Sequence, residues 1–553
     1  MIDDRLTVST LRTEYLVEPL GIDVLRPRLS WVLSSDRRGV TQTAYEVRVA
    51  SARAALDRDE GDLWASGRVE SGDSARIVYA GSTIRARQRA WWKVRVWDGD
   101  GVVSDWSDVT FWERGLSGFS RLSGETPADT WTADWIADPD LRPDPDLPEA
   151  VELDALLPAP LFRTSFTVTK EIVRARLYAT ARGVYEARLN GAKVGDHQLA
   201  PGWTDYARRI QYQTFDVTDA LRPGENVLGA MVGTGWFAGR VAFAPGARHY
   251  GSTPQFLAQL HLDYADGTTE VVATDRSWTT RPGPIRYSDF LMGEYYDAGQ
   301  ERPGWDAPGY DGDGWRPVQL QSKNATPFVS EPAEPVRTQD EFAPAGRTEI
   351  EPGVFVFDLG QNIAGWVRLK AAGPAGTTIR LRFAEILNPD GTLYVTNLRS
   401  ARATDTFVLA GNGLEVFEPR FTWHGFRYVE VSGYPGVPEI EDVTGVFVGS
   451  DTRPVGTFTS SDELVNQLQR NIVWGQRGNF LGVPTDCPQR DERLGWLGDA
   501  QVFVGTAVGN MDVAGFFTKW MRDVADAQSI AGAFPDVAPR LADLSDGAPA
   551  WAD

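Results

Sequence analysis

The hydrophobic pattern changes its period at about residue 456, and this change limits the folds open to the chain more than any other feature. Before it, residues 44–50, 90–97 and 256–264 alternate apolar and polar side chains, which is typical of half-buried strands. After it, apolar residues recur at helical spacing. The first such series is Leu464, Val465, Leu468, Ile472 and Val473. The pattern predicts a mainly β chain with a helical C-terminal part.

The β part is predicted to contain several modules rich in turns. The chain has 55 Gly and 34 Pro, and its Asn190-Gly191 and Asp266-Gly267 pairs are typical of hairpin turns. A length of 553 residues predicts three or four domains. We expect three β-sandwich modules followed by helices. The expected divisions are 1–118 (fibronectin- or immunoglobulin-like), 119–325 (a jelly roll suited to carbohydrate binding), 326–455 (a sandwich supporting the helical part) and 456–553 (helical).

The helical part is predicted to begin with a capping box formed by Ser460 and Glu463, which stand three residues apart. Two further helices are expected over residues 500–508 and 513–524. Residues 482–498 then form a loop between the first two helices. Two other stretches, 115–129 and the proline-rich 138–160, are expected to be irregular because proline interrupts both helices and central strands.

The charge balance argues against nucleic acid or an anionic membrane as a partner. The sequence has 76 acidic and 55 basic residues, a net charge of −21, and a polyanion would be repelled. A single cysteine, Cys487, excludes an intrachain disulfide and a cysteine-cluster zinc site. No signal peptide and no apolar run of membrane-spanning length is recognised, so a cytoplasmic protein is expected. No cofactor requirement is indicated.

The densest group of reactive side chains lies in residues 484–499. It holds two arginines, a tryptophan and four carboxyl groups, and the carboxyls are those of Asp486, Asp491, Glu492 and Asp499. Sugar hydrolysis needs one carboxyl that donates a proton to the departing oxygen and others that bind hydroxyls and stabilise positive charge. The alternative interpretation is a solvated loop of Arg–Asp pairs.

Motifs along nearly the whole chain closely resemble bacterial α-L-rhamnosidases of glycoside hydrolase family 78. The resemblance lies in the order and spacing of several short motifs, and residues 486–499 are the most specific of them. The others include Pro27-Arg28-Leu29-Ser30-Trp31, Gly183-Val184-Tyr185-Glu186, Pro201-Gly202-Trp203-Thr204-Asp205-Tyr206, Gly365-Trp366-Val367-Arg368 and Trp423-His424-Gly425-Phe426-Arg427-Tyr428.

The resemblance implies β-sandwich domains in front of an (α/α)6 barrel, and hydrolysis of terminal α-L-rhamnose with inversion. Carried onto this sequence, it makes Glu492 the general acid. Asp486 and Asp499 would hold the sugar, and Arg490 and Trp496 would line its pocket. Because family members differ by one residue between the aspartate and the glutamate of this loop, Asp491 is an alternative acid.

The resemblance also places the general base, a glutamate, after residue 553. We therefore expect the helical domain to be incomplete and the 553-residue chain to be inactive by itself. The expected partner is a rhamnose-containing glycoside, whereas the aglycone and the oligomeric state stay open. The competing function is a non-catalytic, multidomain carbohydrate-binding protein, and the carboxyl cluster at 486–499 argues against it.

Several other residues need an interpretation. In some relatives the second module binds rhamnose with calcium. Ca²⁺ binding near Asn190, Trp203 and Asp205 is therefore one interpretation of this module, and a purely structural module is the other. No metal ligands are assigned. His424, which stands among aromatic residues, and Cys487, which has no nearby histidine, are expected to be packed and not catalytic.

Overall fold

The computed structural model describes residues 5–118, 129–145, 147, 156–243, 246–323, 325–541, 546–548 and 551. The chain divides into two compact units. The first contains Met1–Thr132 and Pro327–Ala333, and the second contains Ala133–Thr326 and Glu334–Asp553. Parts of the two stretches predicted to be irregular, residues 119–128, 146 and 148–155, lie outside the described residues.

The first unit contains two antiparallel sheets that share one core. One sheet has the order β1-β2-β6 and the other β4-β3-β7-β8, with β5 beside β3. Trp31, Trp92 and Trp112 are buried in the core, because alternate positions of each strand face inward. The elements are β1 (Thr7–Thr13), β2 (Arg28–Ser34), β3 (Gln42–Ala50), α1 (Arg53–Asp57), β4 (Trp64–Ala65), β5 (Val69–Glu70), β6 (Ile77–Val78), β7 (Arg89–Asp98), β8 (Thr110–Glu113) and β23 (Phe328–Ser330).

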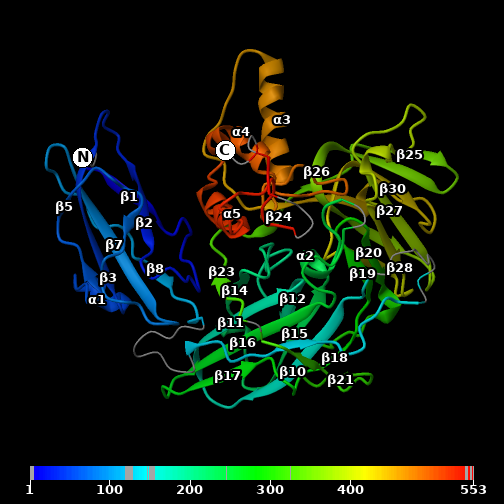
Figure 1. Ribbon diagram of the computed structural model, residues 1–553, viewed down its shortest axis with the longest axis horizontal. Helices are drawn as coiled ribbons and strands as arrows, with labels where there is room; N and C mark the ends of the chain where they lie inside the picture. The colour runs from blue at the N-terminus through cyan, green and yellow to red at the C-terminus, as the bar shows by residue number, and fades with distance from the viewer. Residues whose placement is uncertain are drawn as a thin grey trace. The chain divides into compact units, whose positions relative to one another are not determined.

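The second unit begins with a β-sandwich (Figure 1). One sheet has the order β13-β12-β15-β10-β18-β21, and the other contains β22-β9-β16-β11-β14 with β17 beside β16. Apolar residues of both sheets, among them Phe162, Leu228 and Leu260, form one core. The strands are β9 (Trp135–Ala137), β10 (Pro160–Val168), β11 (Ile172–Arg182), β12 (Val184–Leu189), β13 (Ala192–Lys193), β14 (Ile210–Asp216), β15 (Gly224–Gly233), β16 (Gln255–Tyr264), β17 (Thr269–Ala273), β18 (Thr279–Pro282), β21 (Arg316–Pro317) and β22 (Gln319–Gln321).

The two predicted hairpin turns of this sandwich are confirmed. Asn190 and Gly191 have φ values of 52° and 91° and connect β12 to β13, while Gly267, with φ of 81°, lies between β16 and β17. Positive φ at both central residues is what a two-residue hairpin with the right-handed strand twist requires.

A ten-stranded sheet follows, with the order β19-β20-β28-β27-β30-β26-β31-β24 and with β25 and β29 pairing with β26. The strands β19 and β20 precede residue 325, so the second predicted module contributes to this ten-stranded sheet. Residues 327–333, predicted to belong to the third module, instead cluster with the first unit. The strands are β19 (Ile285–Asp289), β20 (Gly293–Asp297), β24 (Val336–Phe342), β25 (Gly346–Glu351), β26 (Val354–Ala372), β27 (Thr378–Ala384), β28 (Thr404–Val408), β29 (Leu414–Phe417), β30 (His424–Ser432) and β31 (Val443–Ser450).

The C-terminal part is helical, as the change of period predicts. Its helices are α3 (Glu463–Asn479), α4 (Leu497–Asn510) and α5 (Ala514–Ala527), and a short α2 (Gly235–Ala238) precedes them (Figure 1). The predicted capping box is wrong: Asp462 is the N-cap, and its side chain accepts a hydrogen bond from the Leu464 amide at 2.9 Å. No helix of the described residues is long and apolar enough to cross a membrane.

Helix α5 is fixed to the sandwich by buried charges. Asp523, which is fully buried, lies 2.5 Å from Arg209 Nη2 and 2.8 Å from Lys519 Nζ. The Lys519 ammonium also donates to the Trp203 carbonyl at 2.5 Å. Buried carboxylates persist when they are paired and hydrogen-bonded, so this group specifies where α5 packs.

Candidate active site

The acidic segment predicted from the sequence is an irregular loop between α3 and α4, and Arg493 anchors it. The Arg493 side chain is fully buried, donates through Nη1 to the carbonyls of Phe290 and Trp423, each at 2.8 Å, and lies 4.9 Å from the Trp423 ring centre. Its φ of 60° is unusual for a residue with a Cβ. Burial lowers the pKa of its guanidinium to about 10. The contacts of Arg493 with these two carbonyls therefore hold the loop in place.

Glu492 lies at the centre of the loop and is 7% exposed. Its Oε2 atom lies 3.1 Å from Arg490 Nε and 2.6 Å from Arg399 Nη2, and its Oε1 atom accepts a hydrogen bond from Trp496 Nε1 at 3.0 Å. Three side chains thus orient this one carboxyl group, which is the arrangement expected of a group that must meet a reacting atom in a fixed geometry.

Asp486 shares the Arg490 guanidinium with Glu492. Its Oδ2 atom lies 3.1 Å from Arg490 Nη2, and its Oδ1 atom accepts from the Leu494 amide at 3.3 Å. The pKa of Asp486 is raised, mainly by burial and then by the neighbouring charge of Glu492. A hydrogen bond from the Cys487 thiol acts in the opposite direction but does not outweigh them. Two neighbouring carboxyl groups in a partly buried site are a common arrangement for acid–base chemistry.

Asp491, the alternative acid, instead faces the segment that connects β27 to β28 in the ten-stranded sheet. Its Oδ1 atom lies 2.6 Å from Arg399 Nε, and its Oδ2 atom accepts from the Ser400 hydroxyl at 2.5 Å. The side chain is 4% exposed. Both carboxylate oxygens therefore interact with one segment of the fold, which is what a structural role requires.

A cavity of about 330 Å³ adjoins the loop between α3 and α4. Asp486 and Asp499 both line it, so the structure brings two of the predicted sugar ligands together. Asp499 is exposed in the first turn of α4. Trp496 is partly buried, with its ring centre 5.2 Å from that of Trp551. The other lining residues are Ile472, Gly475, Gln476, Asn479, Phe480, Pro484, Thr485, Ala500, Phe503 and Phe517.

Metal binding has one candidate cluster among the described residues. Asp486, Cys487 and Glu492 each offer a ligand atom within 4.8 Å of the others. Burial raises the pKa of the Cys487 thiol to about 12, and both carboxylates already contact arginines, which does not favour a cation. In the second module, the Asn190 side-chain amide donates hydrogen bonds to the Ala220 carbonyl and to the Asn226 side-chain oxygen. Calcium binding by the second module stays a prediction.

The other residues singled out in the sequence are packed. His424 is fully buried, lies 3.0 Å from Asp405 through Nε2, and stacks on Phe383 at 4.2 Å. Trp203 is also fully buried and bonds the Tyr250 hydroxyl at 3.2 Å. A tryptophan in this position contributes to the core and is not a platform for a sugar ring.

Two segments from outside the helical part also contact the loop, and no motif in the sequence predicted either contact. Arg399 and Ser400 follow a short turn before β28, and the Ala242 amide donates to the Glu492 carbonyl at 2.9 Å. The Arg399 guanidinium also lies 5.4 Å from the Phe243 ring centre. Arg399 has φ of 56°, so its backbone is strained where its side chain reaches the carboxyls.

We predict that Arg399→Ala lowers kcat about tenfold or more, because Glu492 loses one of its three orienting contacts. Steady-state kinetics measure the effect. Arg399→Lys should be intermediate, and Arg402→Ala, an exposed change in the same segment, should have no effect. An unchanged kcat in Arg399→Ala would show that the contact is only structural.

Family models match most of the chain. A Rha78A-like N-terminal immunoglobulin domain matches residues 8–118, an α-L-rhamnosidase N-terminal domain 170–340, a bacterial α-L-rhamnosidase concanavalin-like domain 348–449, and a bacterial α-L-rhamnosidase 6 hairpin glycosidase domain 453–553. The carboxyl cluster lies within the last match. Fold and site together define the class of multidomain glycosidases.

Comparison with individual proteins shows which glycosidases this chain is similar to in sequence and fold. An α-L-rhamnosidase of Streptomyces avermitilis is 40% identical, over 99% of this chain and 67% of its own length, and one of Formosa agariphila is 38% identical, over 99% and 58%. The crystal structure of the Streptomyces avermitilis α-L-rhamnosidase complexed with L-rhamnose superposes with a TM-score of 0.93 at 38% identity, covering 99% of this chain and 68% of that one. An α-L-rhamnosidase from Dictyoglumus thermophilum gives 0.91 at 37%, covering 98% and 60%.

The chain belongs to the bacterial α-L-rhamnosidase family, as the sequence motifs predicted. It spans between about three fifths and two thirds of the length of these relatives.

Proposed function

We propose that the protein carrying this chain hydrolyses terminal, non-reducing α-L-rhamnose from glycosides or polysaccharides with inversion at the anomeric carbon. The observation that supports it best is the position of Glu492, a nearly buried carboxyl oriented by two guanidiniums and an indole. Asp486, which lines the adjoining cavity with Asp499, lies beside it. A glycosidase needs such a pairing of a proton donor with acceptors for sugar hydroxyls.

In this proposal Glu492 gives its proton to the glycosidic oxygen as the bond to the anomeric carbon breaks. Its Oε1 atom accepts only the indole N–H among the contacts described above, so it is the oxygen better placed to carry the proton toward a substrate. Asp491 is the weaker candidate, because both of its oxygens face Arg399 and Ser400. Arg490 holds Glu492 and Asp486 in a fixed relation through one planar fork.

The same proposal assigns Asp486 and Asp499 to the hydroxyls of rhamnose, and Trp496 to the apolar methyl of this 6-deoxy sugar. Phe480, Phe503 and Phe517 on the cavity wall add apolar surface to a site that would otherwise suit any polyol. A cavity lined by both carboxylates and aromatic rings matches a sugar that carries hydroxyls as well as a methyl group.

We further propose that α3, α4 and α5 begin an (α/α)6 barrel and that the general base belongs to a part of that barrel outside these 553 residues. Inversion needs a second carboxyl about 6.5–9.5 Å from the first, with room for the attacking water. Apolar side chains on these helices are exposed and would be covered by further helices. They include Leu464, Leu468, Val502, Val508 and Met521. On this proposal the 553-residue chain alone has no hydrolase activity.

The sugar ligands can be tested by binding. Asp486→Asn and Asp499→Asn are each expected to weaken L-rhamnose binding about 10- to 100-fold, because a hydrogen bond to a charged group contributes roughly 1.5–3 kcal/mol. Isothermal calorimetry on the whole protein carrying this chain measures the affinity, and D-mannose, which has the opposite ring configuration and a hydroxymethyl group in place of the methyl, tests selectivity. Asp512→Asn, a change beyond α4, is the control. Unchanged affinity in both variants would refute the assignment.

The alternative function is a carbohydrate-binding protein without hydrolysis. It predicts that rhamnose binding survives while no aryl rhamnoside is cleaved, even in the whole protein. A time course of aglycone release from an aryl α-L-rhamnoside separates the two.

A further inference from the structure

The leaving group of the substrate needs a place of its own beside Glu492. On the proposed function Glu492 protonates the glycosidic oxygen, and that oxygen joins the rhamnose to its leaving group. The cavity that Asp486 and Asp499 line is assigned to the rhamnose ring, and neither Glu492 nor Arg399 is among its lining residues. The leaving group therefore requires a surface that is close to Glu492 but outside this cavity.

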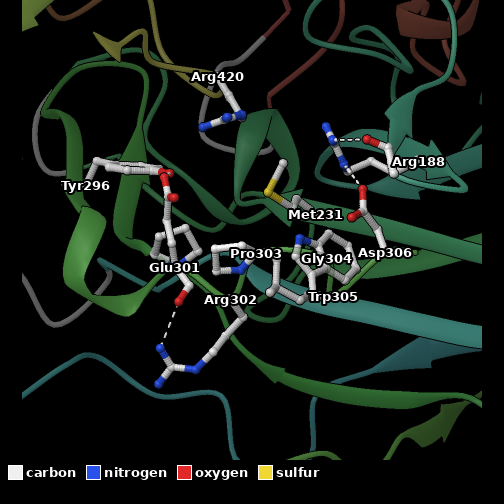
Figure 2. Close-up of a pocket in the computed structure, with 13 residues that line it drawn as sticks. Arg188, Met231, Tyr296, Glu301, Arg302, Pro303, Gly304, Trp305, Asp306 and Arg420 are labelled. Atoms are coloured by element: carbon white, nitrogen blue, oxygen red, sulfur yellow. Dashed lines mark hydrogen bonds and ion pairs between the residues drawn. The ribbon is translucent and has the colours of Figure 1, made fainter. Parts of the chain in front are cut away.

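A second cavity, of about 260 Å³, is not that surface (Figure 2). Figure 2 shows its walls, in which Arg188 pairs with Asp306. None of its lining residues belongs to the loop 484–499 or to the segments around Ala242 and Arg399 that contact this loop. The leaving group of a rhamnoside held at the acidic loop is therefore bound elsewhere.

Phe243 meets both conditions. Its side chain is 40% exposed, and its ring centre lies 5.4 Å from the guanidinium carbon of Arg399, whose Nη2 atom lies 2.6 Å from Glu492 Oε2. The residue before it, Ala242, donates its amide to the Glu492 carbonyl at 2.9 Å. Phe243 is thus connected to the proposed acid both along the backbone and through one guanidinium, and it does not line the first cavity.

The backbone around Phe243 holds this exposed ring in place. Val241 and Ala242 are buried, Ala242 has a φ of 68°, and the Val241 carbonyl lies 3.2 Å from His249 Nε2. The Gly246 amide donates to the Phe243 carbonyl at 2.7 Å. A residue with a Cβ keeps a positive φ only where its surroundings enforce it, and such residues concentrate at functional sites. An aromatic ring presented by a fixed backbone loses little freedom when a ligand stacks on it.

The contacts of Arg399 make stacking the means of recognition at this surface. Its Nε atom lies 2.6 Å from Asp491 Oδ1, and its Nη2 atom donates to the Asp491 carbonyl at 2.7 Å as well as to Glu492. With these two nitrogens engaged, the guanidinium offers an incoming group a planar face beside the Phe243 ring. Flat surfaces of this kind stack on other rings.

We propose that Phe243 is a specificity-determining residue, which stacks on a ring of the leaving group. It then selects rhamnosides of alcohols that carry an aryl or a sugar ring over rhamnosides of small alkyl alcohols. Binding energy from a part of the substrate that does not react can raise kcat as well as lower KM, so the effect is read from kcat/KM.

Three substrates test this role in the whole protein carrying this chain. They are benzyl α-L-rhamnoside, an α-L-rhamnosyl-glucoside, and methyl α-L-rhamnoside, whose leaving group has no ring. All three leave as alcohols and not as phenols, so all three need protonation. Phe243→Ala should lower kcat/KM about tenfold for one or both of the ring-bearing substrates and leave methyl rhamnoside unchanged, as measured by rhamnose release.

Two further variants show whether the ring itself matters. Phe243→Tyr keeps a flat ring and should behave as the wild type, whereas Phe243→Leu keeps apolar bulk without a flat face and should lose activity as Phe243→Ala does. Phe458→Ala, a change at another exposed phenylalanine, is the matched control and should have no effect. Circular dichroism checks folding. A loss confined to the benzyl substrate restricts the leaving group to aryl rings, and one confined to the disaccharide restricts it to sugars.

Phe243 has no such role if Phe243→Ala leaves all three substrates unchanged, or if Phe243→Leu matches the wild type. Equal losses on all three substrates would also overturn it, because they would show that Phe243 only supports Arg399. Each of these results leaves the proposed hydrolysis standing. A wild-type protein that cleaves none of the three substrates would instead refute the proposed function, and the role of Phe243 would fall with it.

Discussion

Replacing Glu492 with glutamine is expected to lower kcat about 10²- to 10⁴-fold on alkyl and sugar rhamnosides, while the fold and the affinity for rhamnose stay unchanged. A glutamine amide keeps the size of the side chain and can still accept from the Trp496 indole, but it has no proton to give to the departing oxygen. The change corresponds to about 3–5 kcal/mol of transition-state stabilisation.

The loss should depend on the leaving group. An aryl rhamnoside whose phenol is acidic needs little protonation, so its hydrolysis should fall much less than that of an alkyl rhamnoside. Asp491→Asn is the matched control, since Asp491 is the neighbouring carboxyl and contacts Arg399 and Ser400. Steady-state kinetics on both substrate types identifies the acid. Equal losses on the two substrates in Glu492→Gln would leave Glu492 only a binding role. A leaving-group effect in Asp491→Asn would make Asp491 the acid.

Much of the fold follows from the periodicity of the sequence. Alternation over residues 44–50 and 256–264 predicted strands, and β3 and β16 contain them, because a residue facing a sandwich core recurs at every second position. The spacing of Leu464, Leu468 and Ile472 likewise predicted α3. The exact helix start was wrong because Ser460 and Asp462 both suit an N-cap. Asp462 has an extended backbone, and its side chain is the one that accepts from the Leu464 amide.

The candidate site was predictable only where it is local in sequence. Asp486, Arg490 and Glu492 lie within seven residues, so one short loop suffices to gather them. Arg399 and Ala242 precede Glu492 by about 90 and 250 residues and carry no motif, and their role depends on how the sheets pack. The roles of the site residues themselves, and the division into four domains, stay predictions.

These distant contacts suggest why the β part and the helical part occur in one chain. The Glu492 backbone is held by Ala242, its carboxyl by Arg399, and the loop as a whole by Arg493 through the Phe290 and Trp423 carbonyls. A loop between two helices would otherwise be among the more mobile parts of a domain. Contacts from outside the helical part therefore supply the rigidity that proton transfer requires.

The strongest stability effect is expected at Asp523 in α5. Its carboxylate is fully buried between Arg209 Nη2 and Lys519 Nζ, so Asp523→Ala removes the buried counter-charge that these two cations share. Removing one partner of a buried ion pair costs about 3–5 kcal/mol. Asp526→Ala is the matched control: it removes a second partner of Arg209, at 3.2 Å, but its side chain is 29% exposed, and pairs near the surface contribute about 1 kcal/mol or less.

Hydrogen exchange of the α5 amides measures this effect locally, which matters because a chain of several modules does not unfold in a single step. In Asp523→Ala the protection of α5 should fall about 10²- to 10³-fold, while amides in β11 and β16 of the sandwich keep theirs. In Asp526→Ala the fall should stay below about tenfold. If α5 is equally protected in both variants, the buried charges do not fix the helix, and its position is set by the apolar contacts of Phe516 and Trp520 alone.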